Sequence, residues 1–195
     1  MRFSPDTIGG LFGTALASSL ALAGLGLAIG VGIGGPVRES LGLAPPRRRL
    51  GPAGLGLAVL GTLTLSHGLD LALTAIGARE AGALGRIDEL LAGAPESALV
   101  GAVLAMAVAP ALGEEILFRG VLLKEFARRL GEFPGLALSS LLFGVIHLDL
   151  AQGAAAAILG LYLGALALRT GSVHATILCH GVNNLVAIIS ARAGP

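Results

Sequence analysis

The sequence predicts an all-α membrane protein, a polytopic bundle of about six transmembrane helices in a single domain over residues 1–195. Of its 195 residues, 54% are hydrophobic and only 13% are charged, about half the roughly 25% expected of a soluble globular protein. Mean hydropathy is +0.86. The apolar runs are continuous and longer than the strands of roughly ten alternating residues in a transmembrane β-barrel, so they favour helices.

Six apolar stretches follow one another along the chain. They lie at residues 8–33, 54–76, 98–123, 135–148, 154–168 and 173–190. The first contains no charge and is longer than the roughly 7–15 apolar residues of a signal peptide, so we expect it to remain as a span. Residues 1–96 then form an N-terminal part, and residues 97–195 form a core that contains the polar motifs described below.

Basic residues in the connecting segments predict the orientation. Eight fall on one side of the predicted bundle: Arg38, Arg47, Arg48, Arg49, Lys124, Arg128, Arg129 and Arg169. Four fall on the other: Arg2, Arg79, Arg86 and Arg192. The positive-inside rule places the first side in the cytoplasm. The segment 78–96 is then outside, and the helical spacing of Ile87, Leu90, Leu91 and Ala94 predicts a short amphipathic helix on the membrane surface.

Partners and redox state are only loosely constrained. The net charge is +1, so we expect the lipid bilayer and a membrane-anchored partner rather than nucleic acid. The single cysteine allows no internal disulfide. Oligomeric state is not determined by the sequence.

Charged residues within the spans are costly to bury and need a reason. Glu115 and Arg119 are four residues apart in the third stretch, so they share a helix face and can form an ion pair. Glu114 is rotated by about 100° from Glu115 and has no partner on its own helix. A carboxylate in this position suits general-base chemistry. The alternative is a purely structural ion pair, which explains Glu115 and Arg119 but not Glu114.

Two further polar motifs lie in the fourth and sixth stretches. His147 follows Phe143 near the end of one, and His180 lies four residues before Asn184 in the other, on the same helix face. The His180–Asn184 face can donate hydrogen bonds to a developing oxyanion. The alternatives are an interfacial role for His147 and interhelical hydrogen bonds for His180 and Asn184.

The second stretch carries His67 and Asp70, which are three residues apart. Solvation at the membrane interface is the favoured interpretation, and an accessory role at a site stays open.

The three polar motifs together resemble the CAAX protease and bacteriocin-processing (CPBP or Abi) family of intramembrane proteases, which includes type II CAAX prenyl endopeptidases. The similarity consists of Glu-Glu-x-x-x-Arg at residues 114–119, Phe-x-x-x-His at 143–147 and His-x-x-x-Asn at 180–184, in that order. It covers about residues 98–189. The chain contains no His-Glu-x-x-His motif of a site-two metalloprotease and no rhomboid or presenilin signature.

The resemblance implies an intramembrane endopeptidase. In that family's chemistry, Glu114 with His147 activates a water molecule, His180 and Asn184 stabilise the oxyanion, and Glu115 with Arg119 tunes the charge of Glu114. We expect no metal, because no carboxylate is apparent behind either histidine. The alternative is a zinc ion held by Glu114, His147 and His180.

The expected substrate is a membrane-anchored protein or peptide in a bacterial cytoplasmic membrane. If the site opens outward, the chain is similar to myxosortase-like sorting enzymes that remove C-terminal anchor segments. The alternative function is a non-catalytic peptide-binding or bacteriocin-immunity protein. A transporter is disfavoured because the sequence shows no internal repeat.

Overall fold

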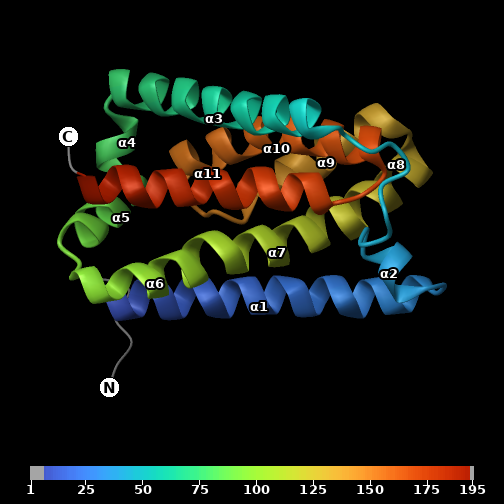
Figure 1. Cartoon of the computed structure of the whole chain (residues 1–195), viewed down its shortest axis with the longest axis horizontal. Helices are drawn as coiled ribbons and strands as arrows, with labels where there is room; N and C mark the ends of the chain where they lie inside the picture. The colour runs from blue at the N-terminus through green and yellow to red at the C-terminus, as the bar shows by residue number, and fades with distance from the viewer. Residues whose placement is uncertain (1–6, 194–195) are drawn as a thin grey trace.

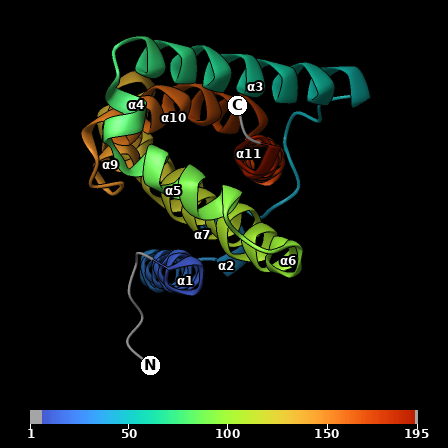
Figure 2. The same ribbon diagram turned by 90° about the vertical axis from the view of Figure 1, so that its left-hand side faces the viewer.

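The computed structural model describes residues 7–193 of the chain and is helical throughout, with no strand among the residues described. The long helices run side by side along the long axis of the molecule (Figure 1). Seen from one end, α11 lies between α3 and α7 (Figure 2). The prediction of an all-α, polytopic helical bundle is confirmed, and the protein is a multi-pass membrane protein.

Five helical segments are long and apolar enough to cross a membrane. They are α1 (Ile8–Ile33), α3 (Pro52–Ala75), the continuous segment Glu96–Leu130, α10 (Leu150–Thr170) and α11 (His174–Ala193). Shorter helices connect them: α2 (Val37–Ser40), α4 (Ala78–Ala81) and α5 (Ala83–Ala92). The segment Glu96–Leu130 consists of η1 (Glu96–Ala98), α6 (Leu99–Ala102), η2 (Val103–Val108), α7 (Ala109–Glu115), η3 (Ile116–Leu122) and α8 (Leu123–Leu130).

The sixth apolar helix, α9 (Glu132–Val145), is shorter than the others. Its 14 residues rise by about 21 Å, less than the roughly 30 Å of a hydrocarbon core. Helix α9 is therefore too short to cross the full hydrocarbon core. The turn that carries His147 follows directly after it.

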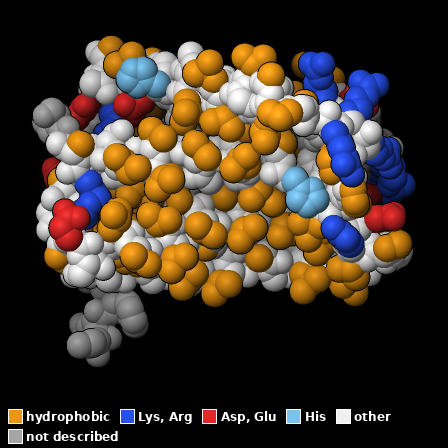
Figure 3. Space-filling view, in the orientation of Figure 1, with side chains coloured by type: hydrophobic (Ala, Val, Ile, Leu, Met, Phe, Trp, Pro, Cys, Tyr) orange, Lys and Arg blue, Asp and Glu red, His pale blue; other side chains and the backbone are white. Residues whose placement is uncertain are grey.

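The two ends of the molecule differ in charge. Lysine and arginine side chains gather at the end that holds α2 and α8 (Figure 3). The orientation predicted from these residues stays a prediction because no membrane is present, and Arg2 lies outside the described residues.

The amphipathic helix predicted in segment 78–96 exists as α5, although Ala94 lies beyond its end. Its apolar face does not lie free for a membrane surface. Leu91 is 2% exposed and packs with Ala102 and Ile188, and Ile87 borders the same cluster. Helix α5 therefore closes the end of the bundle opposite the basic end.

Glycines allow α1 to approach the segment that carries the site. Gly113 lies so close to α1 that an added Cβ atom would collide with the carbonyl oxygen of Ser19. Gly26 contacts the backbone of Leu117 from the other side. Such close approach through small residues is how helices associate without a hydrophobic driving force between them. Contacts within the chain thus hold Glu114, one residue beyond Gly113, in its place.

Candidate active site

Two π-helical stretches, η2 and η3, flank the short α-helix that ends with Glu114 and Glu115. Pro110 is the second residue of this helix and lacks an N–H group, so the regular hydrogen-bond ladder is interrupted at this point. Such π-helical turns are rare and frequent at functional sites. They change the direction in which successive side chains leave the helix, and this segment is where the predicted charged residues lie.

The predicted ion pair between Glu115 and Arg119 is present. Arg119 Nη1 donates to Glu115 Oε1 across 2.9 Å, and the two side chains are 1% and 0% exposed, respectively. The guanidinium also lies over the Phe143 ring, 4.1 Å from its centre. Gly160 makes room for this stack, since a Cβ atom there would lie 3.2 Å from Arg119 Nη2.

A contact that the sequence does not predict joins Glu115 to His180 on α11. His180 Nδ1 donates to the same Glu115 Oε1 atom across 3.0 Å. The expectation that no carboxylate lies behind either histidine is therefore wrong for His180. The Glu115 carboxylate bridges a guanidinium and an imidazole, and this fixes the orientation of the His180 ring. No local signal could have revealed the contact, because it depends on the packing of α7 against α11.

Glu114 faces the other nitrogen of the same ring. Its Oε2 atom lies 3.9 Å from His180 Nε2, too far for a direct hydrogen bond. A water molecule can bridge two polar atoms at such a separation. Glu114 has no partner on its own helix, as predicted, and the basic group within 4.0 Å of its carboxylate, His180, comes from α11.

His147 lies just beyond α9, next to Leu148, whose φ of 56° is the only positive one among the described residues other than glycine. Its Nδ1 atom donates to the Phe143 carbonyl oxygen across 2.8 Å. The Phe143 ring makes edge contacts with His147 and His180, with centroid distances of 5.2 and 6.0 Å. Phe143 thus contacts three of the predicted site residues. In the sequence, Phe143 was noted only as the first residue of the Phe-x-x-x-His motif.

Asn184 is anchored across the bundle. One of its amide hydrogens is donated to the carbonyl oxygen of Met106 across 3.1 Å. Its Oδ1 atom accepts from Asn183 at 3.5 Å. An amide nitrogen carries two hydrogens, so one remains for another acceptor. Asn184 therefore forms the interhelical hydrogen bond considered above, and its second amide hydrogen remains for another acceptor.

His147, His180 and Asn184 line one cavity of about 200 Å³. Glu114 is not part of the cavity lining but lies behind His180. The cavity extends to Asp70 and Arg79, whose side chains form an ion pair at the end of the bundle that holds α4. His67 is exposed and lies outside the cavity lining. The structure therefore separates the two residues of the second stretch and brings only Asp70 near the site.

A zinc ion held by Glu114, His147 and His180 would require these three side chains to converge on one point. Both histidines use Nδ1 for another partner, which leaves Nε2 as the free atom, as in many metal-bound histidines. Nevertheless, the described residues contain no group of three or more His, Cys, Asp or Glu side chains close enough to hold a metal ion. Glu114, His147 and His180 do not fit a zinc site in this arrangement.

The fold and the site define a multi-pass membrane protein with a buried polar cluster beside a cavity. A family model described as "Type II CAAX prenyl endopeptidase Rce1-like" matches residues 96–186. This segment holds every predicted site residue. Residues 96–186 are therefore similar to type II CAAX prenyl endopeptidases, as the three motifs indicated. No curated protein and no solved structure matches the chain.

Proposed function

We propose that this protein is an intramembrane endopeptidase that hydrolyses a peptide bond with water activated by Glu114. The observation that carries the proposal is the buried cluster in which Arg119 and Glu115 orient His180 toward Glu114. Charged groups within spans are expensive and mark functional sites. An ion pair alone would account for Glu115 and Arg119, but it gives no reason for a second glutamate aimed at the same histidine.

The proposed chemistry begins with a water molecule held between Glu114 and His180. Because the Nδ1 proton of His180 points at Glu115, a neutral ring offers the Nε2 lone pair to this water. Glu114 accepts one proton from the water, and the hydroxide oxygen forms a bond with the scissile carbonyl carbon. When the C–N bond breaks, Glu114 returns the proton to the leaving nitrogen.

The oxyanion formed in this step needs hydrogen-bond donors in the cavity. The free amide hydrogen of Asn184 is the donor we propose, while His180 holds the water through Nε2. His147 lines the same cavity from the turn after α9 and contacts the water or the carbonyl group of the substrate. This differs from the assignment made from the motifs, in which His147 activates the water with Glu114, and His180 and Asn184 together stabilise the oxyanion.

The proposed substrate is a membrane-anchored protein segment in a bacterial cytoplasmic membrane. The cavity opens toward Asp70 and Arg79, away from the basic end. If the basic end is cytoplasmic, the site opens outward, which suits removal of the membrane anchors of exported proteins, as in myxosortase-like enzymes.

The proposal is tested by proteolysis in liposomes with tagged anchor segments as substrates. We expect Glu114→Gln to lower kcat by about 10²- to 10⁴-fold, the usual contribution of a general base, with unchanged folding. Glu132→Gln, which changes an exposed glutamate at the start of α9, is the matched control and is expected to cleave normally. Equal activity of the two variants would rule out Glu114 as the base.

The same samples, treated with a chelator, test whether cleavage needs a metal ion. We propose a metal-free reaction, so cleavage by the wild type is expected to survive treatment with 1,10-phenanthroline. If the chelator abolishes cleavage and added zinc restores it, the metal-free mechanism is wrong, but the assignment as a protease stands. A folded wild type that binds the segments with no cleavage would favour the non-catalytic peptide-binding function.

A further inference from the structure

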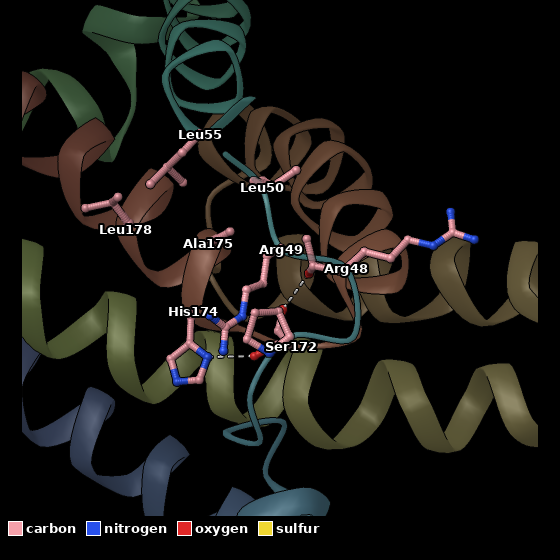
Figure 4. Close-up of a pocket in the computed structure, with 10 residues that line it drawn as sticks. Arg48, Arg49, Leu50, Leu55, Ser172, His174, Ala175 and Leu178 are labelled. Carbon is pink, nitrogen blue, oxygen red and sulfur yellow. Dashed lines mark hydrogen bonds between the residues drawn. The ribbon is translucent and has the colours of Figure 1, made fainter. Parts of the chain in front are cut away.

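A second cavity lies at the basic end of the molecule, apart from the candidate active site. It has a volume of about 360 Å³ and lies between the segment before α3 and the start of α11 (Figure 4). None of the six predicted site residues lines it. Nothing in the proposed protease chemistry uses this cavity.

The polar half of this cavity is built on a tightly anchored loop. The backbone N–H groups of Arg47 and Arg48 donate to the Thr170 carbonyl oxygen at the end of α10, across 2.8 and 3.3 Å. The buried Ser172 hydroxyl donates to the Ala44 carbonyl oxygen across 2.9 Å and accepts from His174 Nδ1 across 2.7 Å. The loop is thus held in place at both ends, and the His174 ring is oriented.

The charges in the cavity are of one sign. Arg48 and Arg49 line it, and its lining contains no aspartate or glutamate. Neither arginine side chain forms an ion pair or hydrogen bond with any residue in the described range 7–193. Arg128 and Arg129, at the same end of the molecule, are instead paired with Glu125. Arg48 and Arg49 therefore keep all their guanidinium donors for an external anion.

The other half of the cavity is apolar. Leu50 before α3 and Leu55 in its first turn line the cavity together with Leu178 on α11, and Leu178 is 43% exposed. A free phosphate ion would use only the arginine half. A molecule with an anionic head and an apolar body matches both halves, and basic pockets between transmembrane helices bind such lipid headgroups.

We propose that this cavity binds an anionic phospholipid. Its phosphodiester group contacts Arg48 and Arg49, and an acyl chain lies along Leu55 and Leu178. The inference does not depend on the proposed protease activity.

The test is native mass spectrometry of the full chain in neutral detergent, titrated with phosphatidylglycerol and, separately, with phosphatidylcholine. We expect the wild type to prefer phosphatidylglycerol. The double variant Arg48→Gln/Arg49→Gln is expected to bind it roughly 25-fold more weakly, from about fivefold per arginine. The matched control is Arg128→Gln/Arg129→Gln, which removes the same charge at the same end and is expected to bind like the wild type.

Two outcomes would overturn the proposal. One is equal weakening in both double variants, because it would mean a general effect of net charge. The other is glycerol phosphate displacing the lipid at equal concentration, because it would assign the cavity to free phosphates. If the Arg48→Gln/Arg49→Gln variant fails to fold, the single variant Arg49→Gln replaces it, with an expected loss of roughly fivefold.

Discussion

Arg119 is the most completely buried cation of the structure's described part, and its contacts explain how it is tolerated there. It forms an ion pair with Glu115 and stacks on Phe143, while its Nη2 atom has no hydrogen-bond partner among the described residues. A buried ion pair is weak evidence for stability, but removal of one partner leaves the other charge uncompensated.

We therefore expect Arg119→Gln to destabilise the protein by about 3–5 kcal/mol, measured as the free energy of unfolding by SDS in mixed micelles. The double variant Arg119→Gln/Glu115→Gln is expected to recover part of this loss, because it leaves no uncompensated carboxylate. Arg128→Gln, on the exposed face of α8, is the control and is expected to change little. Wild-type stability of Arg119→Gln would show that the buried pair is dispensable.

At the scale of elements, contact between α1 and α7 depends on Gly113. A side chain at this position would meet the Ser19 backbone, and backbone atoms cannot move aside as a flexible side chain can. We expect Gly113→Ala to destabilise the protein by about 1–3 kcal/mol, the usual cost of overpacking, in the same unfolding assay. Cleavage should fall as well, because Glu114 is the next residue.

Gly24→Ala provides the matched control for this contact. An added Cβ atom at Gly24 meets nothing within 4 Å, and alanine has the higher helix propensity. The variant is expected to be as stable as the wild type or slightly more so. Equal effects of the two substitutions would contradict the proposed role of the close contact.

The start of α10 is fixed by Asp149, two residues after His147. Its carboxylate accepts hydrogen bonds from the backbone N–H groups of Gln152 and of Ala83 at the start of α5, across 2.9 and 3.0 Å. These bonds, that of Gln152 first, hold the pKa of Asp149 below its ordinary value. The stability that this charge contributes is present above the ordinary aspartate pKa and is lost as the pH falls through the lowered value.

We expect Asp149→Asn to be less stable than the wild type at neutral pH by about 0.3–1 kcal/mol, the typical worth of a negative charge at a helix N-terminus. Asparagine keeps one oxygen for the bond from Gln152 but replaces the other with an amide group, so the substitution removes the charge and the bond from Ala83. Unfolding of both proteins measured from neutral pH to below pH 4 should show the difference shrinking in the acid range. A difference that is independent of pH would assign it to something other than the charge.

At the scale of the whole molecule, the direction in which the site opens depends on orientation in the membrane. The basic end holds Arg48 and Arg49, and the turn after α9 lies toward α5 at the other end, as the bond from Ala83 to Asp149 shows. The positive-inside rule therefore places this turn on the outer side.

Cysteine-accessibility labelling checks this orientation. Leu148→Cys, at a position 92% exposed, is expected to react with a membrane-impermeant maleimide added outside intact cells. Arg48→Cys is expected to react only after the membrane is permeabilised. The single native Cys179 is buried and should stay unlabelled. Labelling of the two engineered positions in the opposite pattern would place the site on the cytoplasmic side.

Much of the molecule could be predicted from the sequence because the relevant signals are local. Long apolar runs reveal the spans whatever their neighbours are, and α1 spans residues 8–33 as predicted. The ion pair of Glu115 and Arg119 follows from their separation by four residues on one helix. The main difference between the predicted and observed helices is the short α9. The apolar run at residues 135–148 continues past Val145, where the helix ends.

Contacts between helices were decided only by the tertiary structure. The bond from His180 to Glu115 joins residues 65 positions apart, and the approach of Glu114 to the same ring depends on the register of α7 against α11. The stack of Arg119 on Phe143 and the extension of the cavity to Asp70 also need helices from different parts of the chain. Helical periodicity tells which residues share a face, but not which face of another helix they meet, because packing angle and register arise from all the contacts together.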